Sequence, residues 1–260
     1  MVSLSPSSYS PDRGPVAKVT RRLTQWRTAL PLTIAPDRPI VCFTFDDFPK
    51  SAAIAGARIL EQAGGHGTYY ACTGMSGTRN ETGELFDESD IRRLVAAGHE
   101  IGAHTQSHID CALTPLADAV ADIEENLERL ERMGAPVPIT QFAYPYGETT
   151  VALKRHLIGR FDSVRGILPG TNTTKSDLMQ LRAYELDGST ARTDRALAAI
   201  RSLNQSPGWI VLFTHDVGEQ SSGFGVSEAT LANLVAEAVD AGASLLTMSE
   251  ALRAVRGAPA

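Results

Sequence analysis

The sequence has few cysteines, no long apolar run and no excess of positive charge, and each of these absences excludes a class of protein. Cys42, Cys72 and Cys111 are its three cysteines, without a C-x-x-C spacing, so neither a disulfide framework nor a structural zinc knot is expected. No apolar run reaches the length that a membrane span needs. The net charge of −6 argues against nucleic acid as the main partner.

The beginning of the chain also lacks a secretory signal. Residues 1–15 are rich in Ser and Pro, rather than a charged start followed by an apolar core, so a cytoplasmic protein is predicted. We expect residues 1–16 to form a disordered arm, residues 17–38 a basic helix with its lead-in, and residues 39–260 one folded domain.

The basic segment has no acid between Asp12 and Asp37. Its apolar residues Val19, Leu23, Trp26 and Leu30 recur at helical spacing. We favour a helix that closes the bottom of a barrel. The alternative is a basic amphipathic helix that makes a peripheral contact with an anionic membrane surface or a partner.

From Ile40 onward, short apolar segments alternate with segments of helical periodicity. We predict strands at 40–45, 68–72, 100–103, 140–144, 162–166, 183–187, 209–214 and 244–247. We predict helices at 51–63, 87–97, 115–133, 149–158, 190–205 and 227–241. This alternation indicates parallel strands with right-handed crossovers, closed into an α/β barrel whose chemistry lies at the carboxyl ends of the strands.

The first predicted strand ends in two adjacent carboxylates, Asp46 and Asp47. Burying two carboxylates side by side is costly because like charges disfavour each other. A buried strand with this ending therefore calls for a cation or a proton-transfer task. A solvated acidic turn is the alternative for this segment alone.

Two histidines follow a later strand. His104 and His108 are four residues apart, the spacing that places two imidazoles on one face of a helical turn and on one metal ion. Together with Asp47 they would make a site of two histidines and one carboxylate. Such a set leaves coordination positions open, which is typical of a catalytic rather than a structural metal.

Two further strand ends are followed by groups that could take part in catalysis. Pro145 and Gly147 fix an irregular turn that would present the Tyr146 backbone N–H to the site, unless this turn only packs on its neighbours. His215 follows the strand at 209–214 and is a candidate general acid or third metal ligand. A structural histidine is the alternative.

Taken in their order along the chain, these four segments resemble the motifs of the family-4 carbohydrate esterases, which are polysaccharide deacetylases with a NodB-homology domain. The matching segments are Thr44-Phe45-Asp46-Asp47, His104-Thr105-x-x-His108, Ala143-Tyr144-Pro145-Tyr146-Gly147 and Leu212-Phe213-Thr214-His215. The resemblance implies a distorted (β/α)7, TIM-like barrel. It also implies metal-dependent removal of N-acetyl groups from N-acetylglucosamine-type residues of an oligo- or polysaccharide. The pattern is similar to cytoplasmic deacetylases of exopolysaccharide and holdfast-adhesin assembly in alphaproteobacteria.

The resemblance also assigns roles to individual residues. Asp47, His104 and His108 would bind the metal, Zn²⁺ or another divalent ion such as Co²⁺, Ni²⁺ or Mn²⁺. Asp46 would be the general base and His215 the acid. The Tyr146 N–H would share the oxyanion with the metal, beside Pro145. Leu212 would line the acetyl pocket, and Asp187 would orient His215. Phe224, between two glycines, is either a sugar-stacking platform or the anchor of its loop.

One departure from the family pattern concerns the base. The third motif usually carries an Arg that holds the base carboxylate, and this chain has Ala143 there. We hypothesise that Arg165 or Arg182 supplies the missing cation.

Two other functions stay open at this point. One is hydrolysis of a non-sugar amide or formamide, and the other is a non-catalytic glycan-binding relative. The sequence leaves the oligomeric state open, with a homodimer as one option.

Overall fold

The computed structural model describes residues 14–257, so the arm expected at 1–16 lies almost wholly outside the described residues. All eight strands expected from the sequence join one sheet of parallel neighbours within this part of the chain. They are β1 (Ile40–Asp46), β2 (Thr68–Ala71), β5 (Glu100–Ala103), β6 (Gln141–Ala143), β7 (Ser163–Arg165), β8 (Tyr184–Glu185), β9 (Trp209–Thr214) and β10 (Ser244–Leu245).

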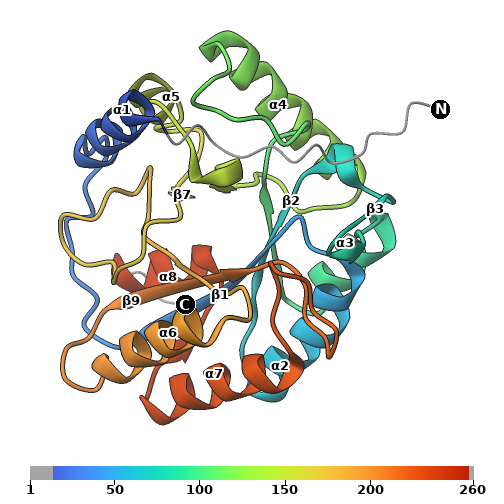
Figure 1. Ribbon diagram of the computed structural model, residues 1–260, viewed down its shortest axis with the longest axis vertical. Helices are drawn as coiled ribbons and strands as arrows, with labels where there is room; N and C mark the ends of the chain where they lie inside the picture. Colours follow the sequence, from blue (N-terminus) through green and yellow to red (C-terminus); the bar gives the residue numbers. More distant parts are fainter. Residues whose placement is uncertain (1–13, 258–260) are drawn as a thin grey trace.

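Strand β1 is the centre of this sheet. The strand order is β7-β6-β5-β2-β1-β9-β8, and β10 pairs with the first residues of β1. Every residue of β1 is buried, as its apolar sequence predicts for a parallel strand covered on both faces. At the far edge, Arg165 of β7 pairs with Leu181, which lies just before β8. The sheet therefore curls back on itself into the distorted barrel of Figure 1.

Helices surround the curled sheet, and each predicted helix is present. They are α2 (Ala57–Gln62, preceded by a π-helical turn, Ala52–Gly56), α3 (Glu88–Ala96), α4 (Leu116–Arg132), α5 (Val151–His156), α6 (Thr190–Ser202) and α7 (Glu228–Asp240). A helix of this kind forms the crossover that parallel strands require.

The sequence interpretation missed a helix and a short hairpin. Helix α8 (Met248–Val255) begins directly after the strand expected at 244–247, where Thr247 and Glu250 form a capping box. The spacing of these two residues was a signal for a helix start. The hairpin of β3 (Arg79–Asn80) and β4 (Gly83–Glu84) has strands of two residues, too short for any periodicity.

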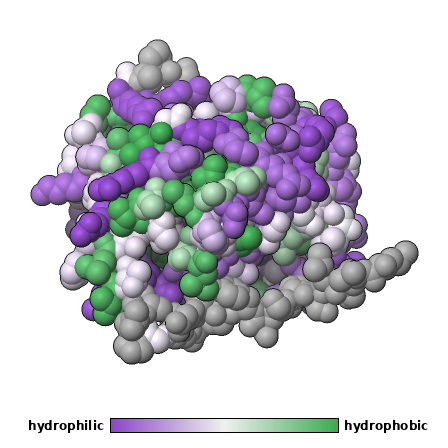
Figure 2. All heavy atoms as spheres, turned by 90° about the horizontal axis from the view of Figure 1, so that it is seen from above, coloured by the Kyte–Doolittle hydropathy of each residue, from purple (hydrophilic) through white to green (hydrophobic). Residues whose placement is uncertain are grey.

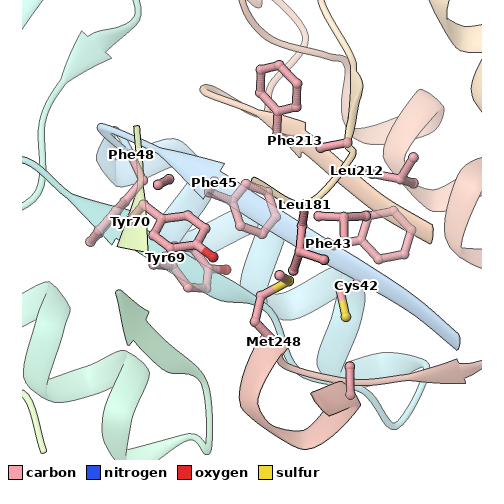
Figure 3. Packing of buried hydrophobic residues seen from close by; sticks show 14 of the residues in the cluster. Cys42, Phe43, Phe45, Phe48, Tyr69, Tyr70, Leu181, Leu212, Phe213 and Met248 are labelled. Atoms are coloured by element: carbon pink, nitrogen blue, oxygen red, sulfur yellow. The ribbon is translucent and has the colours of Figure 1, made fainter. Parts of the chain in front are cut away.

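Aromatic packing fixes the direction of the side chains of β1. The rings of Phe45 and Tyr69 stack with centroids 4.6 Å apart, and the Phe48 ring meets Tyr69 edge-on at 5.1 Å (Figure 3). The Phe45 ring also lies so close to Gly56, in the π-helical turn, that a Cβ there would come within 3.0 Å of it. Because side chains alternate along a strand, Asp46 points to the opposite side of the sheet, into the barrel.

Helix α1 (Pro15–Trp26) lies beside α5 (Figure 1). The buried Lys154 of α5 donates to the carbonyl oxygens of Thr24 (3.0 Å) and Arg27 (2.9 Å), and lies 2.6 Å from the Asp177 carboxylate. The expected plug at the bottom of the barrel is wrong. A plug would bury its apolar face, whereas Val19, Leu23 and Trp26 of α1 are exposed, and Leu30, past the end of the helix, is partly buried against the core.

We predict that Lys154→Met lowers the free energy of unfolding by about 3–5 kcal/mol, because it leaves the buried Asp177 carboxylate without its cation. Chemical denaturation of the full chain measures this change. Arg155→Met, at the exposed neighbouring position, is the matched control and should change stability by less than about 0.5 kcal/mol. Equal effects of the two substitutions would contradict the role given to Lys154.

Candidate active site

The carboxyl end of β1 carries two buried carboxylates that face different partners. Asp46 and Asp47 are each 5% exposed. Asp46 is the last residue of the strand, and Asp47 turns the chain with a positive φ of 44° while its N–H donates to the Tyr70 carbonyl at 3.0 Å. This left-handed turn separates the two side chains, so that adjacent residues serve different contacts.

The partner of Asp46 is Arg165, the last residue of β7. The Arg165 Nη2 donates to Asp46 Oδ2, and Arg165 is fully buried. Its guanidinium carbon lies 5.3 Å from the Tyr70 ring centroid and 4.6 Å from that of Phe213. These rings hold a cation that is weakly hydrated and stacks readily on aromatic faces.

Arg165 also explains the departure at Ala143. Residues 143 and 165 are register partners on the adjacent strands β6 and β7. A cation absent from the end of one strand is therefore supplied by its direct neighbour. Arg182, the other candidate, instead donates from Nη1 to the Pro169 carbonyl at 3.2 Å.

The partners of Asp47 are two histidines. His108 Nε2 lies 2.8 Å from Asp47 Oδ2. His104 Nδ1 lies 2.8 Å from the Ala143 carbonyl, which assigns its proton to Nδ1 and leaves Nε2 with a lone pair. One ligand atom from each of Asp47, His104 and His108 can be chosen so that all lie within 4.8 Å of one another.

This arrangement fits a metal ion. Among the described residues, Asp46 Oδ1 and Asp47 Oδ1 are buried without a hydrogen-bond partner. A buried carboxylate oxygen without a donor is costly, and a cation bound by Asp47 would remove that cost. One carboxylate and two imidazoles are also a ligand set that divalent transition metals accept. These three residues could therefore hold a metal.

The charges of Asp47, His104 and His108 shift one another's pKa values. Burial on its own raises the pKa of Asp47, but His108 and His104 outweigh it and hold that pKa well below its usual range. Burial also lowers the pKa of His104, which keeps this imidazole neutral and able to bind a metal. For His108 the Asp47 charge outweighs burial and raises the pKa.

The histidines do not lie on the helical turn that their spacing suggested. Residues 104–109 form an irregular loop, in which Thr105 (φ 62°) and His108 (φ 49°) are left-handed. Such conformations cost about 1–3 kcal/mol each and persist only where surrounding contacts impose them. The two imidazoles nevertheless meet, with ring centroids 5.2 Å apart.

Helix α4 supplies the contacts that impose this loop. The Asn126 side chain accepts from the His104 N–H at 3.1 Å and donates to the Ala71 carbonyl at 3.0 Å. Asp122 Oδ1 accepts from the N–H groups of Gln106 and Ser107. Sequence reasoning missed both α4 residues. Their signal was a polar pair at i, i+4 among the apolar residues of the inner face of α4.

The turn after β6 places a ring against the metal-site histidine. Tyr146 has a positive φ of 58°, between the buried Pro145 and Gly147, and its ring centroid lies 4.6 Å from that of His108. Burial and the charge of Asp47 raise the pKa of Tyr146 to about 12, so the phenol is neutral at ordinary pH.

His215 follows β9 at the same end of the sheet. Its Nδ1 lies 3.3 Å from the Phe224 carbonyl, and its backbone N–H donates to the same oxygen at 3.1 Å. The Phe224 ring, 46% exposed, meets the imidazole at a centroid distance of 5.7 Å. Phe224 is thus a neighbour of His215 as well as part of its loop.

The expected partner of His215, Asp187, is engaged elsewhere. Its carboxylate accepts from Ser189 N (3.0 Å) and Ser189 Oγ (2.6 Å) and lies 3.3 Å from Arg192 Nε. Burial raises the pKa of Asp187, but these contacts outweigh it and lower that pKa. A backbone carbonyl, rather than a carboxylate, therefore orients His215.

The expectation for Leu212 is corrected as well. Leu212 and Phe213 leave β9 on opposite sides (Figure 3), as neighbours on a strand do. Phe213 packs on the guanidinium that holds Asp46, so Phe213 faces the acidic end of the barrel and Leu212 faces away from it.

Residues 33–157 match the family model described as polysaccharide deacetylase. These residues belong to the polysaccharide deacetylase family. The matched part contains β1, the histidine loop and the Tyr146 turn, but ends before Arg165 and His215. No curated protein matches the chain.

Solved structures of the carbohydrate esterase family share the fold. The CE4 family pseudoenzyme BA3943 of Bacillus anthracis is 14% identical with a TM-score of 0.61, over 87% of this chain and 70% of that one. The peptidoglycan deacetylase PdaC of Bacillus subtilis is 18% identical with a TM-score of 0.54, over 86% and 94%. A family 4 carbohydrate esterase of Streptomyces lividans, solved with acetate, is 20% identical with a TM-score of 0.53, over 80% and 91%. These likenesses show the distorted barrel fold.

We predict that Arg165→Met costs about 3–5 kcal/mol of folding free energy in the metal-free protein, because Asp46 is then a buried charge without a partner. The double variant with Asp46→Asn should recover most of this loss, since no charge stays buried. Denaturant unfolding measures both. Arg182→Met is the control, and an equal loss there would contradict the assignment of Arg165.

We predict that Zn²⁺ binds the protein at one site, and that His104→Ala abolishes this binding in calorimetric titration. Asn126→Ala should weaken it about tenfold, because the loop that carries His104 loses its anchor. His156→Ala, on the exposed end of α5, is the matched histidine control and should leave the affinity unchanged. Tight binding by the His104 variant would exclude this triad as the site.

Proposed function

We propose that the protein is a metal-dependent deacetylase that hydrolyses N-acetyl groups on N-acetylglucosamine-type residues of an oligo- or polysaccharide. The observation that carries this proposal is the placement of Asp47, His104 and His108 within 4.8 Å of one another beside the Asp46–Arg165 pair. A candidate metal site and a separate carboxylate base thus lie together at the carboxyl end of a parallel barrel, where such folds carry out chemistry.

The metal site has a defined chemical task in this proposal. Asp47, His104 and His108 would hold Zn²⁺ or another divalent ion, which supplies a Lewis acid and lowers the pKa of water toward ~7. The other steps belong to the chain's own residues. Asp46, held by Arg165, takes a proton from the water whose oxygen bonds to the acetyl carbon. A carboxylate that is paired with a guanidinium stays ionised and correctly aimed for this transfer.

The leaving group needs an acid. Breaking the C–N bond releases an amine, which departs poorly unless its nitrogen is protonated. His215 is the proposed donor of this proton, with its Nδ1 fixed by the Phe224 carbonyl. We propose the Tyr146 backbone N–H as a donor to the oxyanion, in the left-handed turn beside His108. The products are acetate and the free amine of the sugar.

The substrate assignment rests on the family and on the rim of the site. Phe224 is 46% exposed beside His215, where a ring could stack on a sugar face. Peptidoglycan is named as the substrate class of one structural relative. That the glycan here is an exopolysaccharide or holdfast adhesin, and that the protein is cytoplasmic, stay predictions. No helix among residues 14–257 is long and apolar enough to cross a membrane.

A catalytically inactive relative is the second candidate function, because the pseudoenzyme from Bacillus anthracis has the same fold. The retained Asp46, Asp47, His104, His108 and His215 argue against it. A protein that only binds glycan has no need for a base, three metal ligands and an acid together.

We predict acetate release from N-acetylglucosamine oligomers by the Zn²⁺-loaded protein, abolished by a chelator and lowered about 10²–10⁴-fold by Asp46→Asn. Asp162→Asn, at the exposed amino end of β7, is the matched control and should keep full activity. Glycan binding without acetate release would support the binding-protein function instead. Release from small amides such as N-methylacetamide at a similar rate would indicate a non-sugar amidase.

A further inference from the structure

Helix α1 exposes an apolar stripe. Val19 is 58% exposed, Leu23 49% and Trp26 76%. These residues are spaced by four and three positions, so at 3.6 residues per turn they lie on one side of the helix. We call Val19, Leu23 and Trp26 the α1 stripe.

On the opposite side of α1, polar residues hold the helix to the barrel. Arg21 is paired with Glu148, and Thr24 is 6% exposed with its carbonyl bonded to Lys154. A surface helix ordinarily turns its apolar side to the core and its polar side to water. The described residues of α1 show the reverse. About half or more of each side chain of the α1 stripe stays exposed, so the stripe is available for another surface.

The charged side chains beside the α1 stripe indicate which kind of surface it would bind. Arg22 and Arg27 are exposed and lie on either side of the α1 stripe around the helix. The chain has no acid between Asp12 and Asp37, whereas the whole protein has a net charge of −6. Helix α1 is thus a basic, apolar region on an acidic molecule. A second copy is a poor occupant, because a two-fold contact would bring the same basic side chains together.

We propose that the α1 stripe docks on an anionic lipid surface, with Trp26 and Leu23 inserted at the level of the headgroups and Arg22 and Arg27 on the lipid phosphates. An apolar face flanked by basic side chains is the pattern of helices that lie in a membrane interface. Tryptophan is enriched at that level because its ring is apolar and its N–H polar.

The attachment of α1 links this surface to the candidate active site. Glu148, the partner of Arg21, directly follows the turn of Tyr146. Lys154 fixes the other end of the helix. A membrane on the α1 stripe would therefore lie across helix α1 from this part of the site. Figure 2 views the molecule from the side that carries α1, α4 and α5 in Figure 1, and shows hydrophobic patches among hydrophilic side chains on that face.

Intrinsic fluorescence tests the proposal, because the chain has two tryptophans and one of them is shielded from the surface. Trp209 is fully buried, with its indole N–H 3.1 Å from the Cys42 sulfur, so a change in emission reports Trp26. We expect a blue shift on adding vesicles of phosphatidylcholine and phosphatidylserine, and none with phosphatidylcholine alone. The full chain should co-sediment with the anionic vesicles, and salt should reverse this binding.

Substitutions on α1 separate the contribution of apolar burial to vesicle binding from that of the basic charges. Trp26→Ala should weaken vesicle binding about tenfold, from lost apolar burial. Arg22→Gln and Arg27→Gln should each weaken it about fivefold, which is the value of one basic residue at an anionic surface. The matched controls are Val239→Ala, an exposed apolar side chain on α7, and Arg253→Gln, an exposed arginine on α8. Both should bind like the original chain, and all variants should keep its thermal unfolding midpoint.

Three outcomes would overturn the proposal. One is the absence of binding and of a blue shift with anionic vesicles. Another is binding that is equal for neutral and anionic vesicles or that survives the α1 substitutions. The third is a concentration-dependent dimer that Trp26→Ala dissociates, which would make the stripe a contact between copies. None of these readouts depends on deacetylation, so they are independent of the proposed activity.

Discussion

The contact between Asp46 and Arg165 is the constraint on which the rest of the site depends. A buried carboxylate and a buried guanidinium can each be tolerated only with the other. They sit on β1 and β7, with β2, β5 and β6 between them in the sheet, so they meet only because the sheet curls. The rings of Tyr70 and Phe213 fill the space around the pair. The curled sheet and the buried pair thus require each other.

Because of this contact, the two adjacent carboxylates have different partners. Asp46 lies in the barrel interior and is held by Arg165, while Asp47 faces His104 and His108. The separation is made by backbone conformations that most residues avoid, at Asp47 and in the histidine loop. Helix α4 sustains that loop through Asn126. Strain at the site is therefore balanced by hydrogen bonds from a regular element behind it.

Helix α1 is attached to the barrel through polar contacts instead of apolar packing. Most large apolar side chains of the barrel are buried, whereas α1 is bound through polar residues and exposes Val19, Leu23 and Trp26 to water. Such an inversion is costly for a helix whose only partner is the domain it belongs to. It is reasonable for a helix that serves two surfaces at once, and that is why we assign the outer one to lipid.

The sequence by itself determined the elements and the main chemistry: eight parallel strands, their helices, and the placement of Asp46, Asp47, His104 and His108 at strand ends. Apolar periodicity and strand order carry that information because they act locally along the chain. Only the tertiary structure shows that Arg165, and not Arg182, pairs with Asp46, and that the Phe224 carbonyl, and not Asp187, contacts His215. It also shows that Phe213, and not Leu212, faces the site, and that the α1 stripe is exposed. Each of these depends on which distant segments the curled sheet brings together, and no local pattern encodes that.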